Sequence, residues 1–217
     1  MNPVFKQPSR EDAAEPSKGP RSMAFRIGCL AWGSLVWDPR TLPRAGGFQT
    51  DGPKLPIEFS RVALDGRVTL VIDPMAREVR THWVRLAVES LEEAVAELGM
   101  REKIAPVMWP RWVGRQLRRD PMQGMGTADP GVRRVIADWL EERALDAVVW
   151  TSLPSRGAAG GAKRPNCNQL VRHLKSLEGA ARDRAEEYIR RAPESIRTAY
   201  RMQFEERLGW IPRRGGD

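Results

Sequence analysis

The sequence predicts an α+β fold, with strands in the first half of the chain and helices in most of the second half. Three patterns support this prediction: an apolar run that begins at Ile27, an Asp65-Gly66 pair between two β-rich segments, and helical spacing of apolar residues after residue 129. Asp-Gly supplies the positive φ angles of a two-residue hairpin turn, and apolar residues three and four positions apart line one face of a helix. We therefore expect a small mixed or closed sheet with a helical C-terminal extension.

The composition sets the size and organisation of the protein. With 217 residues, 41% of them hydrophobic, the chain is long enough for one domain with a core. Residues 1–22 are rich in Pro, Ser and charged groups, so we expect them to be disordered, and Met23 would suit a start of the chain. The main domain is predicted over residues 23–178, and residues 179–217 form a helical extension packed on it.

The strands are predicted from β-branched and aromatic residues between turn signals. The run from Ile27 breaks at Gly33-Ser34, and a loop rich in Pro and Gly follows over residues 38–54. The later strands are expected at residues 57–64 and 67–72, which form the hairpin, at residues 79–88 in the same sheet, and at residues 145–153.

The helices are predicted from apolar spacing and from end signals. Ser90 and Glu93 form a capping-box pattern and Gly99 is a stop signal, so the first helix should span residues 91–98. The other helices are expected to begin at Asp129-Pro130, at Asn166 or Asn168, near Ala180, and at Pro193 with an end at Gly209.

The net charge of +8 is concentrated between Arg101 and Arg134, where eight basic residues stand against three acidic ones. Trp109 and Trp112 are interleaved with arginines in this segment, as on surfaces that bind nucleic acid. A solvated arginine-rich face explains the same pattern, and we favour it over a nucleic-acid surface.

Several classes of function are disfavoured by what the sequence lacks. Cys29 lies in an apolar run and Cys167 in a polar loop, so they form neither a disulfide framework nor a metal-ligand spacing. This cysteine usage suits a reducing compartment, so we expect a cytoplasmic protein. No apolar run approaches the length of a membrane span, and the N-terminus lacks the basic-then-apolar order of a secretory signal. With only His82 and His173 and no Walker or HExxH motif, we expect no metal and no cofactor. The sequence does not indicate an oligomeric state.

Two segments contain the residues that we consider for chemistry. Gly33-Ser34-Leu35 follows the first strand, and it is either an ordinary loop or a backbone nest whose N–H groups hold a carboxylate or carbonyl. Glu102 lies in a charged connector just beyond the first predicted helix, and such connectors are usually solvated. From these residues alone, both interpretations of each segment stay open.

Taken in order, four segments resemble the landmarks of the γ-glutamylcyclotransferase-like superfamily, nearest to its ChaC type, over roughly residues 25–177. The four segments are Trp32-Gly-Ser-Leu-Val-Trp37, Arg67-Val-Thr-Leu-Val-Ile-Asp-Pro74, Arg101-Glu-Lys103 and Pro165-Asn-Cys-Asn168. The resemblance implies a small mixed β-barrel with flanking helices, a Gly33-Ser34-Leu35 loop that binds the γ-glutamyl group, and Glu102 as the acid/base. It also implies a small γ-glutamyl compound as substrate and 5-oxoproline as product.

The chain departs from that family at two places. Trp32 stands where a Tyr is usual, and residues 104–109 replace a run of the Gly-Gly-Tyr type. These departures leave open a non-catalytic ligand-binding or interaction module of the same fold. Trp32 and Trp37 are candidate pocket walls. Arg61 and Arg67 are candidates for binding a substrate carboxylate, although we favour ordinary surface or strand-end positions for both. Glu58 is a competing carboxylate, although we favour an exposed strand position for it.

Overall fold

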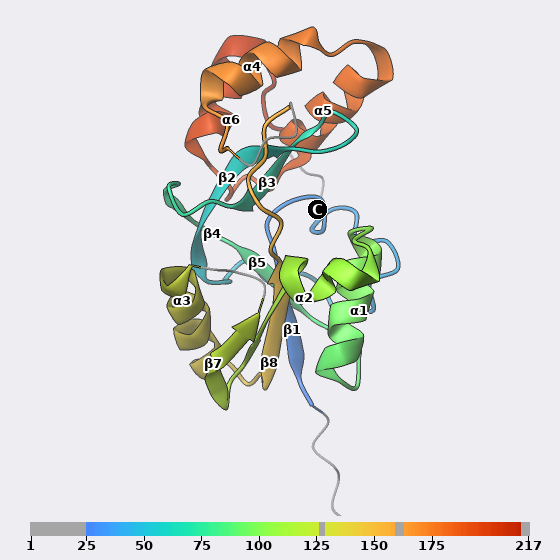
Figure 1. Ribbon diagram of the computed structural model, residues 1–217, viewed down its shortest axis with the longest axis vertical. Coiled ribbons are helices and arrows are strands. Elements are labelled where there is room, and N and C mark those ends of the chain that lie inside the picture. The colour runs from blue at the N-terminus through green and yellow to red at the C-terminus, as the bar shows by residue number, and fades with distance from the viewer. Residues whose placement is uncertain (1–24, 126–128, 159–162, 214–217) are drawn as a thin grey trace, which may run out of the picture.

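The computed structural model describes residues 25–125, 129–158 and 163–213, which form a mixed α+β architecture with two sheets and six α-helices (Figure 1). The strand order is β5-β1-β8-β6-β7 in one sheet and β3-β2-β4 in the other. Both sheets are open within the described residues, so the expectation of a small closed barrel is wrong. The predicted disorder of residues 1–22 lies outside the described part of the chain.

The five-stranded sheet contains the strand predicted from Ile27, which lies between two neighbouring strands. Its members are β1 (Ile27–Ala31), β5 (His82–Arg85), β6 (Val113–Leu117), β7 (Asp120–Met125) and β8 (Ala147–Thr151). β1 pairs antiparallel with β5 and parallel with β8, and all five of its residues are buried. Ile27 and Cys29 enter one hydrophobic cluster while Leu30 and Trp32 enter another, because successive side chains of a strand point to opposite faces. β1 therefore separates two cores.

The three-stranded sheet contains the predicted hairpin. Its members are β2 (Lys54–Val62), β3 (Val68–Ile72) and β4 (Glu78–Arg80). The antiparallel pairing of β2 with β3 confirms the hairpin. Its connection differs from a two-residue turn, because the Gly66 N–H donates to the Ala63 carbonyl at 3.0 Å and the Ala63 N–H donates to the Arg67 carbonyl at 2.8 Å. Gly66 alone takes a positive φ, 86°, as in a longer turn that ends with a glycine bulge.

Residues 79–88 do not form one strand of the hairpin's sheet. The segment divides at Thr81: β4 pairs with β2, whereas β5 pairs with β1 in the other sheet. Thr81 is buried, and its hydroxyl donates to the Pro53 carbonyl at 2.7 Å. This anchor holds the chain where it crosses from one sheet to the other.

The helices begin mostly where the capping residues predicted. They are α1 (Leu91–Arg101), α2 (Trp109–Trp112), α3 (Pro130–Glu141), α4 (Cys167–Ser176), α5 (Gly179–Arg191) and α6 (Ala199–Leu208), with a 3-10 turn η1 (Pro106–Met108). The side chains of Ser90, Asp129 and Asn166 each accept a hydrogen bond from a backbone N–H three residues later, at 3.1, 3.0 and 2.9 Å.

Two predicted helix ends are wrong. Gly99 lies inside α1, where a Cβ would come within 2.2 Å of the Trp109 indole nitrogen, so this glycine serves packing and is no stop. The last helix begins at Ala199, because the Thr198 hydroxyl caps it by accepting from the Arg201 N–H at 3.2 Å, and Pro193 lies outside it. The strands β6 and β7 were not predicted.

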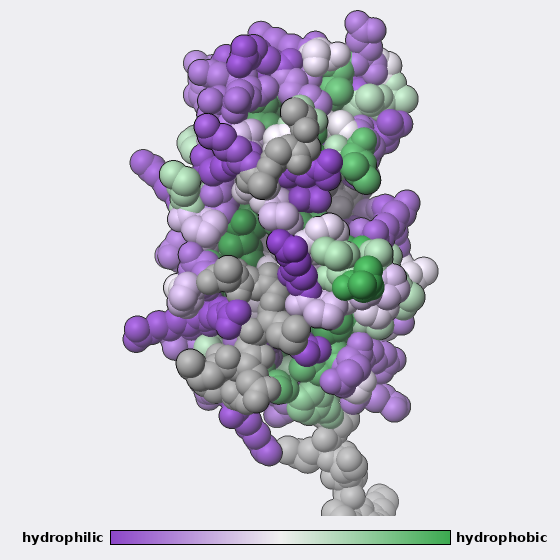
Figure 2. All heavy atoms as spheres, in the orientation of Figure 1, coloured by the Kyte–Doolittle hydropathy of each residue, from purple (hydrophilic) through white to green (hydrophobic). Residues whose placement is uncertain are grey.

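The helices are distributed over the two ends of the molecule (Figure 1). α5 packs on β3 and α6 packs on β2 at one end, whereas α1 and α3 flank the five-stranded sheet at the other. Hydrophilic residues cover most of the face seen in Figure 2, and hydrophobic ones occur there in small separate groups. Among the described residues, no helix has the length and apolar character needed to cross a membrane.

Candidate functional site

A cavity of about 690 Å³ lies where the turn after β1, the β2–β3 hairpin, the end of α1 and α5 meet. Its volume falls in the range of about 300–1,000 Å³ that is usual for small-molecule sites. The lining includes most of the residues that the sequence singled out: Trp32, Gly33, Ser34, Leu35, Trp37, Arg61 and Glu102. The fold thus brings together residues that are far apart in the chain.

The turn after β1 is held by both cores. Trp32 packs in one hydrophobic cluster and Leu35 in the other, so the turn spans the junction between them. The Val36 N–H donates to the Gly33 carbonyl at 3.0 Å, and the Asp38 N–H donates to the Ser34 carbonyl at 2.8 Å. These are the bonds of a single helical turn.

The amide groups at the start of this turn are available for a ligand. The first N–H groups of a helical turn have no partner within the turn. Among the described residues, the N–H groups of Gly33, Ser34 and Leu35 donate to no acceptor. All three residues line the cavity, which gives the backbone-nest interpretation a structural basis.

Glu102 is positioned by the C-terminus of α1. It is the C-cap residue, and Lys103 follows it in the left-handed region with φ 56°. The Ile104 N–H donates to the Gly99 carbonyl at 2.9 Å, and the Lys103 N–H donates to the Met100 carbonyl at 3.0 Å. These two bonds define a Schellman motif, which ends the helix at the edge of the cavity.

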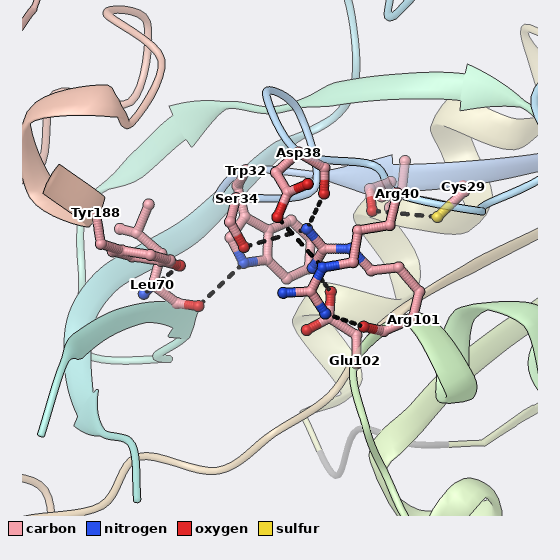
Figure 3. A network of polar contacts seen from close by, with 10 residues as sticks. Cys29, Trp32, Ser34, Asp38, Arg40, Leu70, Arg101, Glu102 and Tyr188 are labelled. Carbon is pink, nitrogen blue, oxygen red and sulfur yellow. Dashed lines mark hydrogen bonds and ion pairs between the residues drawn. The ribbon is translucent and has the colours of Figure 1, made fainter. Parts of the chain in front are cut away.

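Arg101 joins Glu102 to the turn (Figure 3). Its Nη1 lies 2.5 Å from Glu102 Oε1, and its Nη2 donates to Ser34 Oγ at 3.3 Å and to the Asp38 carbonyl. The Arg101 side chain is 3% exposed and that of Glu102 is 19% exposed. The guanidinium therefore fixes the carboxylate and the turn relative to each other in a largely desolvated place.

Tyr188 of α5 closes the other side of the turn. Its hydroxyl oxygen accepts from the Leu70 N–H at 3.4 Å, and the Trp32 indole N–H donates to the Leu70 carbonyl at 3.3 Å. A Cβ on Gly33 would lie 2.5 Å from this hydroxyl, so a larger residue there would require the Tyr188 hydroxyl to move. Burial, with a smaller contribution from the Glu102 carboxylate, raises the pKa of Tyr188 to about 12. The phenol thus stays protonated around neutral pH.

Cys29 lies beneath the same site but is a poor nucleophile. It is fully buried in β1, and burial, reinforced by the Glu102 carboxylate, raises the pKa of its thiol. A thiol must lose its proton to attack. The Cys29 thiol is therefore not a candidate nucleophile for this cavity.

The structure does not bring Glu58 into the cavity. This residue is 2% exposed, so the favoured interpretation as an exposed strand residue is wrong. Its carboxylate accepts from the Phe59 N–H at 2.9 Å and from the Tyr200 N–H at 3.2 Å, at the start of α6. Burial raises the pKa of Glu58. Its place against a helix N-terminus is that of a structural anchor.

Sequence reasoning missed the contribution of α5. Four residues of this helix line the cavity: Arg184, Glu187, Tyr188 and Arg191. The helix is mostly charged, and Tyr188 next to Ile189 was the one local sign of a buried face. The basic segment 101–134 was interpreted as one surface, but Arg101 and Lys103 line the cavity while Arg111 lies in α2 and Arg134 in α3.

The described residues contain no group of three or more His, Cys, Asp and Glu side chains that could hold a metal ion. No protein-family model, curated protein or solved structure matched this chain. Function is therefore inferred from the cavity and from the sequence resemblance.

Proposed function

We propose that this chain is a γ-glutamylcyclotransferase-like enzyme in which Glu102 is the acid/base. The observation that carries the proposal is that Glu102 lines the same cavity as the Gly33-Ser34-Leu35 turn and is joined to Ser34 through Arg101. The architecture would then be a variant of the cyclotransferase fold in which the sheets stay open.

The proposed reaction needs one carboxylate and a set of hydrogen-bond donors. The substrate's α-amine attacks its own γ-carbonyl carbon, a C–N bond closes the five-membered ring, and the bond to the leaving amine breaks. Because the nucleophile is tethered to the electrophile, their effective concentration is high. The attacking nitrogen loses two protons: one passes to solvent and frees the amine, and Glu102 carries the other to the leaving nitrogen. The N–H groups of residues 33–35 stabilise the oxyanion.

Arg101 and Tyr188 support these roles. Arg101 is a positioning residue: it holds the Glu102 carboxylate and the turn in one geometry through contacts to both. Tyr188 places a protonated hydroxyl beside Gly33. Trp32 lacks the hydroxyl that a Tyr would have at this position. The Tyr188 hydroxyl, from α5, takes its place beside the turn.

The test is 5-oxoproline release from a panel of γ-glutamyl amides and amines. We expect Glu102→Gln to lower kcat/KM at least about 100-fold, which is the usual contribution of an acid/base group. The matched control is Glu97→Gln, which removes the same charge from α1 at a position outside the cavity lining. Product from no compound, or equal rates in the two variants, would exclude the proposed mechanism.

A binding module without turnover is the second candidate. It is favoured by the ion pair of 2.5 Å, which engages the Glu102 carboxylate before any substrate arrives. A γ-glutamyl compound that binds in calorimetry, with no 5-oxoproline formed at any pH, would select this function.

A further inference from the structure

Exposed apolar side chains lie on two sides of the cavity. Leu64, in the turn of the β2–β3 hairpin, lines the cavity and is 91% exposed. Val107 of η1, two residues after the lining residue Ala105, is 84% exposed. These are the two most exposed large hydrophobic side chains among the described residues. Figure 1 shows the hairpin turn and the end of α1 on the same side of the molecule, and Figure 2 shows small hydrophobic groups among hydrophilic residues there.

Three exposed cations accompany these apolar side chains. Lys103 and Arg184 line the cavity from the end of α1 and from α5, and Arg111 of α2 precedes the lining residue Trp112. In the part of the chain that the structure describes, none of these three cations forms an ion pair. The acidic side chains of the lining, in contrast, are each paired with an arginine; they are Asp38, Asp65, Glu102 and Glu187.

Together, the two apolar and three basic side chains form one surface, which we call the rim surface. Its members are Leu64, Lys103, Val107, Arg111 and Arg184. A second copy of the chain fits this surface poorly, because a two-fold dimer places the same patch of each subunit against the other and would bring the cations together. A stable dimer also buries about 800 Å² on each subunit around an apolar core. The apolar side chains of the rim surface lie instead on separate segments.

A nucleic acid matches the charge of the rim surface but not its apolar residues. Single-stranded nucleic acid is bound by stacking its bases on aromatic side chains. The apolar side chains of the rim surface are aliphatic, whereas Trp109 and Trp112 are partly buried and pack against a hydrophobic core cluster. An anionic bilayer matches both properties, because its headgroups attract Lys and Arg and its acyl boundary accepts aliphatic side chains.

From these observations we infer that the rim surface docks on an anionic membrane surface. Leu64 and Val107 insert at the acyl boundary, and Lys103, Arg111 and Arg184 lie among the headgroups. The chain then lies on the bilayer without crossing it, and the cavity faces the headgroups. The inference goes beyond the proposed function and does not depend on it, because it rests on the rim surface and not on the reaction.

Sedimentation of the full chain with vesicles tests this docking. Vesicles of phosphatidylcholine alone are compared with vesicles that also contain about 30% phosphatidylserine, at an ionic strength of about 0.1 M. We expect the partition coefficient to be at least about tenfold higher for the anionic vesicles and to decrease as salt is added. Equal partition into the two kinds of vesicle, or no partition into either, would overturn the inference.

Variants assign the binding to the rim surface. The double variant Leu64→Ser and Val107→Ser should lower the partition coefficient for anionic vesicles at least about tenfold, because two aliphatic side chains no longer enter the acyl boundary. Lys103→Gln, Arg111→Gln and Arg184→Gln should each lower it about fivefold, the effect of one cation at an anionic surface.

Matched controls lie away from the rim surface. Met75, between β3 and β4, is 79% exposed, and Arg172 of α4 is also exposed; neither residue lines the cavity. Met75→Ser and Arg172→Gln should leave the partition coefficient nearly unchanged. Control variants that lose as much binding as the rim variants would overturn the assignment of this face.

The two other partners give different results. Tighter binding of a single-stranded RNA oligonucleotide than of anionic vesicles, weakened by the same charge-removing variants, would assign the surface to nucleic acid. A dimer in sedimentation equilibrium that dissociates in the variant with Leu64→Ser and Val107→Ser would assign it to a second copy. Either result would overturn the inference. Since none of these measurements uses 5-oxoproline release, failure of the docking and failure of the proposed function are distinguishable.

Discussion

Replacing Arg101 by Leu removes the guanidinium that joins Glu102 to the turn after β1. We expect this substitution to lower the free energy of unfolding by about 3–5 kcal/mol, the cost of breaking a buried ion pair by removing one partner. A loss of this size, larger than that for a surface ion pair, is expected because the Arg101 side chain is only 3% exposed. Its loss leaves Ser34 Oγ and the Asp38 carbonyl without this donor as well.

The size of the stability loss in Arg101→Leu depends on the Glu102 carboxylate, which is left without its partner. Each hydrogen bond to a charged group contributes about 1.5–3 kcal/mol, but contributions within one network do not add. Glu102→Gln in the Arg101→Leu background removes the uncompensated carboxylate. We therefore expect the double variant to recover at least about 1 kcal/mol relative to the single variant, a coupling typical of residues in contact.

Urea unfolding with linear extrapolation measures these differences, and an unchanged m-value shows that compactness is preserved. Arg134→Leu is the matched control: its side chain is 85% exposed, and the Arg134 to Asp138 distance is 4.0 Å. Such a surface pair should change stability by no more than about 0.5 kcal/mol. An Arg101→Leu effect below about 1 kcal/mol, or no recovery in the double variant, would refute the assignment of Arg101 as the buried link.

Three further predictions concern the same site. Gly33→Ala should cost about 1–3 kcal/mol of stability in thermal unfolding. Adding Tyr188→Phe to this variant should restore stability, because the nearest remaining ring carbon is 3.5 Å from the new Cβ. No recovery in the double variant would contradict the clash. The pKa of Tyr188 is raised to about 12 from 10.0, so folding favours the protonated phenol. Its contribution to the free energy of unfolding is therefore complete below about pH 10 and is lost as the pH rises through about 12. In urea unfolding, the free energy of unfolding should decrease less with rising alkaline pH in Tyr188→Phe than in the unaltered protein. Equal decreases in the two proteins would argue against a buried phenol. Lys103→Gly should raise the melting temperature through a gain of about 0.5–1 kcal/mol, whereas a lower melting temperature would contradict strain at φ 56°.

Local signals predicted the elements whose determinants lie within a few residues. Ser90, Asp129 and Asn166 cap helices because a side-chain oxygen accepts from an N–H only three residues away. Gly209 ends α6 with φ 71°, as a residue without a Cβ can. The hairpin at Asp65-Gly66 belongs to the same class, although its turn is longer than predicted.

The errors occurred where a distant contact decided the outcome. Gly99 is a helix stop by local rules, but the Trp109 indole packs against it inside α1. The segment 79–88 has strand composition throughout, yet Thr81 divides it between two sheets through a contact with Pro53. Glu58 lies on a strand as expected, but its carboxylate accepts from the Tyr200 N–H at the start of α6, and its side chain is buried and not exposed.

The sequence by itself determined the α+β class, the helix caps, the buried strand with its turn at Gly33, and Glu102 as a candidate carboxylate. Only the tertiary structure decided that Arg101 links that carboxylate to the turn and that α5 supplies Tyr188 and Arg184 to the cavity. The physical reason is range. Caps and turns are settled by hydrogen bonds between near neighbours, whereas a cavity forms where apolar faces from distant segments pack together, and α5 has few apolar residues by which that packing could be recognised in the sequence.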